Sequence, residues 1–215
     1  MKTFVLNGWA ASERAWDLCL FERERVFGYV EQMDGKAHAA VRAEESVALV
    51  GWSMGGSFAL RLALEMPEKL KGLVLLAATP RMMEAPNWRG MSERRLAALE
   101  AGLRMTKGEG FFGPQEGRPN PYMMDTDENL KRGLDYLKAT DLRVGLIDLM
   151  ASGRLRCPVC VFQSEHDPIV RAENAKFLAA VFPEARVEIV PGAEHALPVS
   201  IPEEIDEAVA SIVPA

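Results

Sequence analysis

The chain has 215 residues, of which 48% are hydrophobic, and a formal net charge of −6. This length suits one domain with an inserted segment and a sizeable core, and an acidic chain without a basic run is a poor candidate for nucleic-acid binding. No apolar run approaches the ~18 residues of a transmembrane helix, and the first residues lead directly into an expected strand, so we expect no membrane association and a cytoplasmic location.

The predicted elements alternate between strands and helices along the chain. We expect strands near residues 3–7, 25–30, 46–50, 72–78, 158–163 and 186–190, and helices near 36–43, 55–66, 171–182 and 202–212. This alternation implies a mostly parallel sheet of about six strands with helices on both faces, the α/β class.

One block interrupts that rhythm. Residues 81–150 carry helical runs at 92–106 and 127–138 and lie between two strands of the expected sheet. Such an insertion must sit over the strand ends, so we predict a small helical cap. The core is then residues 1–80 and 151–215.

The cysteines and histidines do not predict a metal or redox centre. Cys157 and Cys160 have C-x-x-C spacing, but side chains three apart on a strand point to opposite faces and do not readily close a disulfide. The three histidines are scattered and lack the spacing of metal ligands. We expect core cysteines, no metal and no cofactor.

The segment Gly51-Trp52-Ser53-Met54-Gly55 follows one expected strand and opens the next helix. Strand, G-x-S-x-G and helix together are typical of a nucleophile elbow, a tight turn that strains the serine backbone and exposes its hydroxyl at the edge of a sheet. The pattern alone is weak, because a Gly-rich turn needs no chemistry. With its flanking elements it predicts Ser53 as a nucleophile.

A serine nucleophile of this kind needs a histidine base, which comes last in the order Ser, Asp or Glu, His. His38 precedes Ser53, and His166 adjoins the best acid candidate in sequence. His195 lies on a Gly-containing loop after the last expected strand, so we predict it as the general base. A solvated loop histidine is the alternative interpretation.

The acid of this set should follow a strand between Ser53 and His195. Asp167 stands on the loop after residues 158–163, where its carboxylate could orient the imidazole and stabilise the imidazolium. Glu165 is the rival and Glu84 a more remote one. Aspartate before proline is also a routine turn former, so the prediction depends on its place in the chain order.

Two backbone N–H groups should form an oxyanion hole. One belongs to Met54, the residue after the nucleophile. The other should come from the loop Asn7-Gly8-Trp9 after the first strand. Gly8 permits a close approach of the backbone to the nucleophile, and the N–H of Trp9 is the expected donor.

Together these motifs resemble the α/β-hydrolase esterases, and the chain is most similar to the pimeloyl-[acyl-carrier-protein] methyl ester esterases of biotin synthesis. The matching stretches are Asn7-Gly8-Trp9 with Trp16, Gly51 to Gly56, Pro67-Glu68, Leu73 to Leu75, Thr79-Pro80, Asn87 to Met91, Gly133 to Leu137, Thr140 to Arg143 and Ala193 to Ala196. The resemblance implies an α/β-hydrolase fold and a serine carboxylesterase that forms an acyl-enzyme.

The resemblance also implies a substrate site and a partner. Substrate contacts are expected from Trp9, Ser53, Met54, Phe111, Phe112, Gln115 and His195. The partner would be an acyl carrier protein that presents the acyl ester. Basic cap residues that could dock it are Arg89, Arg94, Arg95, Lys131, Arg132 and Arg143, although solvated helix faces explain these charges equally well.

The chain departs from the family at three places. Asn7 replaces the usual histidine of His-Gly-Trp, and the segment between Trp9 and Ser53 is short for the fold. The segment between Phe111 and Gly133 is also short, so the family's docking arginines have no residue-by-residue match. Two alternatives therefore stay open beside the carrier-linked ester: a general carboxylesterase for small free acyl esters, and a catalytically idle binding protein.

Overall fold

The computed structural model describes residues 1–108 and 117–213, and within them six strands form one parallel sheet. The strand order is β2-β1-β3-β4-β5-β6, and every neighbouring pair is parallel. The strands are β1 (Lys2–Leu6), β2 (Arg25–Phe27), β3 (Val47–Trp52), β4 (Leu70–Leu76), β5 (Val159–Ser164) and β6 (Arg186–Val190). The expected parallel sheet of about six strands is confirmed.

The central strands are buried along their whole length. All six residues of β3 and all six of β5 are buried, as continuous apolar strands of a parallel sheet covered on both faces should be. The strand expected near residues 25–30 is shorter than predicted, because helix α1 (Tyr29–Met33) begins directly after Gly28.

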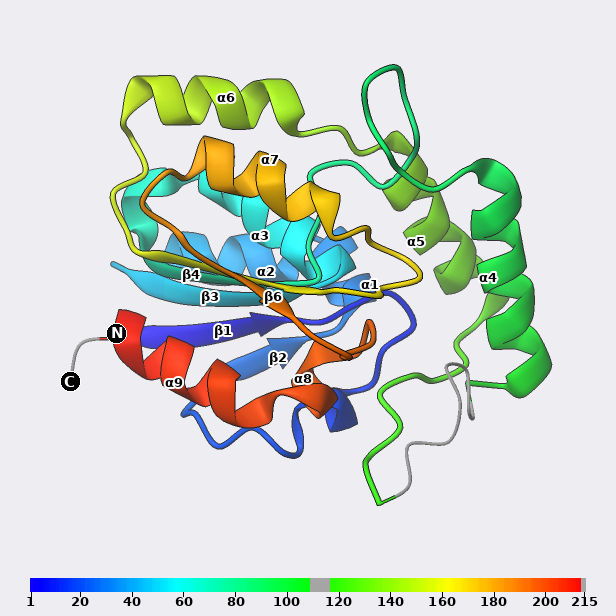
Figure 1. Ribbon diagram of the computed structural model, residues 1–215. Helices are drawn as coiled ribbons and strands as arrows, with labels where there is room; N and C mark the ends of the chain where they lie inside the picture. The colour runs from blue at the N-terminus through cyan, green and yellow to red at the C-terminus, as the bar shows by residue number, and fades with distance from the viewer. Residues whose placement is uncertain (109–116, 214–215) are drawn as a thin grey trace.

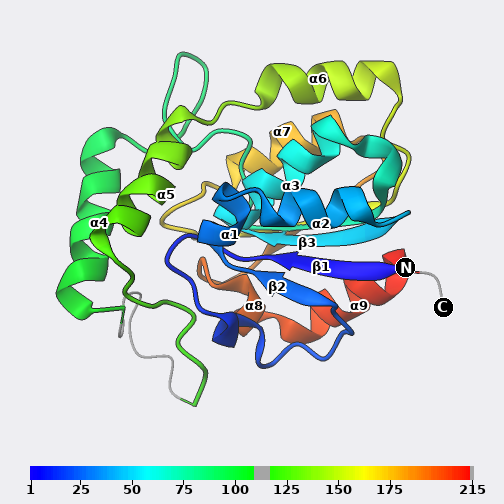
Figure 2. The same ribbon diagram turned by 180° about the vertical axis from the view of Figure 1, so that it is seen from behind.

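Helices cover both faces of the sheet (Figures 1 and 2). One face carries α1, α2 (Lys36–Ala43), α3 (Met54–Glu65), α6 (Arg143–Ser152) and α7 (Glu173–Val181), and the other carries α8 (Leu197–Ser200) and α9 (Pro202–Ile212). Two short 3-10 helices, η1 (Glu13–Trp16) and η2 (Pro67–Lys69), complete the elements before α4. No described helix is both long and apolar enough to cross a membrane.

The inserted block places α4 (Glu93–Thr106) and α5 (Asp127–Ala139) beyond the carboxyl ends of the strands (Figure 1). Ser92 and Thr126 cap these helices, since their side chains accept backbone N–H bonds from the first turns. Where the insertion leaves and re-enters the core, the Leu142 N–H donates to the Pro80 carbonyl at 2.9 Å.

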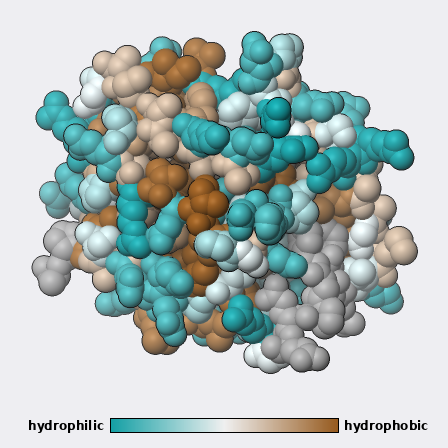
Figure 3. Space-filling model, in the orientation of Figure 1, coloured by the Kyte–Doolittle hydropathy of each residue, from teal (hydrophilic) through white to brown (hydrophobic). Residues whose placement is uncertain are grey.

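Helix α6 begins directly after this junction and packs against α3 and α7. Its inner side buries Leu146 and Leu149, whereas Val144, Ile147 and Met150 are exposed at i, i+3 and i+6. Figure 3 shows apolar side chains gathered over this helix. Part of the predicted 81–150 block therefore packs in the helical layer over the sheet rather than above the strand ends.

Candidate active site

Ser53 occupies the turn between β3 and α3 in a strained conformation. Its φ of 56° and ψ of −118° are rarely adopted by a residue other than glycine. Gly55 lets the start of α3 lie directly against the end of β1, because a Cβ there would lie 2.0 Å from the carbonyl oxygen of Leu6. The serine hydroxyl is thus presented at the carboxyl edge of the sheet, beside the end of β1.

The structure brings Ser53, His195 and Asp167 together in one chain of hydrogen bonds. His195 Nε2 lies 2.8 Å from Ser53 Oγ, and His195 Nδ1 lies 2.8 Å from Asp167 Oδ2. The imidazole is 2% exposed, and the Asp167 side chain is fully buried. Charge-assisted hydrogen bonds in so buried a setting are strong.

The Asp167 carboxylate is itself held by its own loop. Its Oδ1 accepts backbone N–H bonds from Ile169 at 2.8 Å and Val170 at 2.9 Å. Gln163, at the end of β5, donates from Nε2 to Asp167 Oδ2 at 3.2 Å and to the Val170 carbonyl at 2.8 Å. The carboxylate is therefore fixed towards the imidazole before any substrate binds.

The rival residues lie outside this arrangement. Glu165 contacts His166 at 3.6 Å, and both side chains are largely solvent-exposed. Glu84 is exposed and lines a separate surface hollow. His38 forms a pair with Glu65 at 3.0 Å on α2 and α3. Of the candidates weighed from the sequence, only the three predicted members meet.

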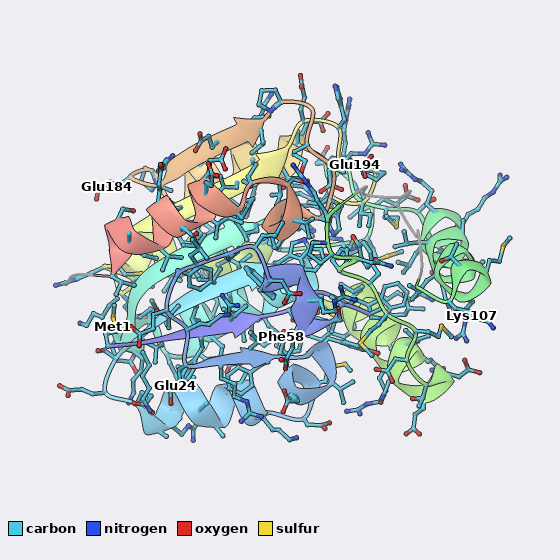
Figure 4. All side chains as sticks on the ribbon, turned by 90° about the horizontal axis from the view of Figure 1, so that it is seen from below. Met1, Glu24, Phe58, Lys107, Glu184 and Glu194 are labelled. Carbon is cyan, nitrogen blue, oxygen red and sulfur yellow. The ribbon has the colours of Figure 1, made fainter. Side chains whose placement is uncertain are left out.

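The loop of His195 is anchored by residues that the sequence prediction missed. Trp52 Nε1 donates to the His195 carbonyl at 2.9 Å, and the two rings lie 5.8 Å apart. The Ser164 hydroxyl donates to the Glu194 carbonyl. Figure 4 shows Glu194 at the end of the sheet that faces the cap, opposite Met1. Two sequence features could have indicated these anchoring residues: the tryptophan inside G-x-S-x-G, and the polar residues at the end of a buried strand.

The loop after β1 runs beside the serine. A Cβ on Gly8 would lie 3.4 Å from Cβ of Ser53, and Trp9 is 7% exposed. Met54 is the first residue of α3, where backbone N–H groups have no partner within the helix. The structure therefore places the two expected oxyanion donors on segments that flank Ser53.

Asn7 organises this loop from within. The side chain is fully buried: its Oδ1 accepts from the Gly8 N–H at 3.1 Å and from Trp16 Nε1 at 3.2 Å, and its Nδ2 donates to the carbonyls of Ala11 and Ser12 at 3.2 and 2.9 Å. An amide supplies both the acceptor and the two donors that this arrangement uses.

A small apolar cavity of about 20 Å³ opens over the serine, comparable to the space of one water molecule. It is lined by Gly8, Trp9, Trp52, Ser53, Met82, Leu99, Tyr122, Leu137, Ile169 and His195. Leu99 of α4 and Leu137 of α5 bring cap helices over the site. The expected substrate contacts Phe111, Phe112 and Gln115 lie outside the described residues.

Tyr122 is a lining residue that the sequence prediction did not identify. Burial, followed by the negative charges of Asp167 and Glu194, raises the pKa of its phenol, so the side chain is neutral beside the histidine. Its ring lies 5.8 Å from that of Trp52. Among residues 1–108 and 117–213, no group of three or more histidine, cysteine or acidic side chains could hold a metal ion.

Comparisons with known proteins place hydrolases among the proteins that this chain resembles. The chain is 27% identical to a pimeloyl-[acyl-carrier protein] methyl ester esterase of Nitrosomonas europaea, over 93% of this chain and 90% of that protein. A hydrolase from Pseudomonas aeruginosa PA01 has a similar structure, with a TM-score of 0.73 and 22% identity over 100% of this chain and 90% of the other. An esterase from Exiguobacterium antarcticum gives a TM-score of 0.73 and 19% identity over 98% and 91%.

The structural likenesses show the fold, and the expected α/β-hydrolase fold is confirmed. The resemblance to the esterase group is confirmed by the relatives' names and coverage. A family model described as serine aminopeptidase, S33, matches residues 26–199, which is more than half of the chain. The chain therefore belongs to this Hydrolase_4 family of α/β-hydrolases.

Proposed function

We propose that the protein is a serine carboxylic ester hydrolase that works through an acyl-enzyme. The observation that carries this proposal is the continuous hydrogen-bonded chain from Ser53 Oγ through His195 to Asp167. The membership of the chain in a hydrolase family supports hydrolysis as the reaction class. An idle binding protein would have no need for a strained serine, a buried imidazole and a fixed carboxylate in contact.

The first half of the reaction forms the acyl-enzyme. His195 Nε2 takes the proton of Ser53 as Oγ attacks the carbonyl carbon of the ester, and the carbonyl oxygen becomes negative. The backbone N–H groups of Trp9 and Met54 stabilise that oxyanion. His195 then gives its proton to the departing alcohol oxygen while Asp167 holds the ring, and the ester bond breaks.

The second half releases the acid. Water enters where the alcohol left, and His195 takes one of its protons as the water oxygen attacks the acyl carbonyl. The same N–H groups stabilise the second oxyanion. Collapse returns the proton from His195 to Ser53 and frees the carboxylic acid, so one water is consumed for each ester cleaved.

We propose pimeloyl-[acyl-carrier protein] methyl ester as the substrate, in biotin synthesis. The support is that relatives covering most of the chain carry this name. Exposed Arg94 in the first turn of α4 offers a positive charge at the cap for an acidic carrier protein. Its neighbour Arg95 donates to the Pro168 carbonyl at 2.8 Å, which places this end of α4 beside the Asp167 loop.

A carboxylesterase for small free esters is the second candidate, and two observations favour it. The cavity over Ser53 has the volume of a single water molecule within the described residues. Most of the basic cap residues are also used internally: Arg143 bonds Asp141 at 2.8 Å, Arg132 bonds Asp34 at 2.6 Å, Lys131 bonds Asp135 at 2.6 Å and Arg89 contacts Glu173 at 3.5 Å.

Turnover of a methyl pimeloyl carrier thioester, measured beside a series of p-nitrophenyl esters of increasing acyl length, tests both candidates. The proposed function predicts methyl ester cleavage with a kcat/KM above that of every free ester, and no turnover by Ser53→Ala. A preference for the shortest free esters would favour the second candidate. Turnover retained by purified Ser53→Ala would overturn the serine mechanism.

A further inference from the structure

Gly133 stands in the interior of α5, where glycine is less favourable than alanine. The structure gives a steric reason for it. A Cβ at this position would lie 2.3 Å from Cδ1 and 2.7 Å from Nε1 of the Trp9 indole, and 3.2 Å from Cε2 of Tyr29. Glycine is therefore needed at this position because the Trp9 ring packs against the helix here, and not because of the helix geometry itself.

The indole has little freedom to retreat. Trp9 is 7% exposed, and its Nε1 donates to the Leu130 carbonyl at 3.1 Å. Leu130 precedes Gly133 by three residues on α5, so both lie on one side of the helix. Moving the ring away from position 133 would break this buried hydrogen bond or displace the main chain of Trp9.

The loop of Trp9 is also held on its other side by the cap. The Met123 N–H donates to the Ala10 carbonyl, and the Ser12 N–H donates to the Pro121 carbonyl, both at 2.8 Å. Between them Ala11 and Tyr122 form an antiparallel bridge. Ala10 itself has a φ of 52°, a conformation that non-glycine residues rarely adopt. A push on the indole is consequently transmitted to the backbone beside Ser53.

We propose that Gly133 is a positioning residue for ester hydrolysis: it leaves room for the Trp9 indole on α5, and this contact sets the backbone N–H of Trp9 in the oxyanion hole. The inference rests on the proposed function, because it takes that N–H as an oxyanion donor. The cap thereby acts on the chemical step as well as roofing the site. Loss of one such donor costs ~10²–10³ in kcat.

The test compares Gly133→Ala with Gly145→Ala, the same change on α6. A Cβ at Gly145 meets only the flexible end of Leu64, at 3.2 Å from Cδ1. We expect Gly133→Ala to lower kcat for p-nitrophenyl acetate by ~10-fold or more, with KM within ~2-fold, and to lower Tm by only a few degrees (~2–8 °C), as overpacking predicts, so that the variant stays folded in the assay. Gly145→Ala should retain the wild-type kcat. A wild-type kcat in Gly133→Ala would overturn the proposal.

A double-mutant cycle separates positioning from simple damage to the helix. Trp9→Ala removes both indole atoms that the new Cβ would meet. In that background, Gly133→Ala should cost less than ~2-fold in kcat, so the two substitutions are strongly non-additive. An equal cost in both backgrounds would show that the Trp9 contact does not transmit the effect, and the proposal would be wrong.

A fluorophosphonate probe keeps this inference distinct from the proposed function. It phosphonylates an activated serine whatever its natural substrate, and its phosphoryl oxygen develops charge where an oxyanion would. If wild-type protein cleaves no ester, the proposed function fails, yet slower labelling of Ser53 in Gly133→Ala than in Gly145→Ala still supports the positioning role. Equal labelling rates, or an unreactive wild-type serine, would overturn it.

Discussion

At the scale of single residues, the site is built by fixing each polar group before substrate arrives. Asp167 accepts two backbone N–H bonds, and His195 is held between Ser53 and Asp167. Groups that are already oriented need no rearrangement when charge develops, which is the main source of electrostatic catalysis. The substitutions that matter most are therefore those that remove orientation while leaving size almost unchanged.

Asp167→Asn is such a substitution, because an amide cannot stabilise the imidazolium. We expect kcat to fall by ~10⁴-fold, slightly less than for His195→Ala, with little added by combining them, since the residues act as one unit. Steady-state kinetics of the two single variants and the double variant check this. Glu165→Gln and Glu84→Gln are the controls; an active Asp167→Asn beside an inactive Glu165→Gln would refute the assignment of the acid.

Asn7 gives a second test at this scale. Asn7→Asp removes the amide that donates to Ala11 and Ser12 and turns a carboxylate towards their carbonyls. Because the side chain is buried, we expect the free energy of unfolding to drop by ~1–3 kcal/mol, with a loss of kcat. Denaturant unfolding measures the change, and Asn87→Asp on the surface is the control. Equal stability of the two variants would contradict the role of Asn7 in holding the loop after β1.

At the scale of elements, the sequence predicts what is local and misses what is brought together by folding. The elbow could be predicted because the apolar strand, the glycines and the helix are adjacent in the chain. The Trp9 contact with Leu130 joins residues 121 positions apart, so no local pattern encodes it. The same holds for Tyr122, whose place beside Trp52 depends on which loops meet at the strand ends.

The junction of the cap with the core yields a pH-dependent prediction. The hydrogen bonds from Arg143, and then from Arg81, hold the pKa of Asp141 well below its ordinary 3.8 against partial burial. A lowered pKa in the folded state stabilises the protein above the unfolded value, and the stabilisation is lost as pH falls through the folded value. The contribution is thus fully present at neutral pH.

We expect Asp141→Asn to lower Tm by ~2–4 °C at pH 7, corresponding to an ion-pair contribution of up to about 1 kcal/mol. The difference from wild type should shrink as the pH falls below ~4. Thermal unfolding from pH 7 to pH 2.5 measures it. Asp148→Asn is the control, because that exposed α6 residue makes no ion pair with another described residue. A constant difference across this range would contradict the linkage.

At the scale of the whole molecule, charge is divided unevenly. Residues 81–150 carry eleven basic and eleven acidic residues, so the net charge of −6 belongs to the rest of the chain. Arg94 and Lys107 lie at opposite ends of α4, and the hydrogen bond from Arg95 to the Pro168 carbonyl places the Arg94 end beside the Asp167 loop. The proposed acidic carrier would therefore meet a positive charge close to the site at this end of α4, whereas the rest of the body would repel it.

Hydrolysis of a carrier-bound methyl ester should consequently weaken with salt, because exposed charge pairs are screened over ~10 Å at 0.1 M. Hydrolysis of a small neutral ester should barely respond, since apolar contacts bind it.

Arg94→Glu should raise KM for the carrier substrate by ~3–10-fold and spare the small ester, as a rim charge changes association more than chemistry. Lys107→Glu makes the same charge change on the same helix, away from the Asp167 loop, and should leave both substrates unaffected. Steady-state kinetics of the three proteins between 25 and 400 mM salt give the answer. If both substrates respond equally to salt, and both charge reversals act alike, the carrier does not dock at this end of α4, and the small-ester hydrolase becomes the better account.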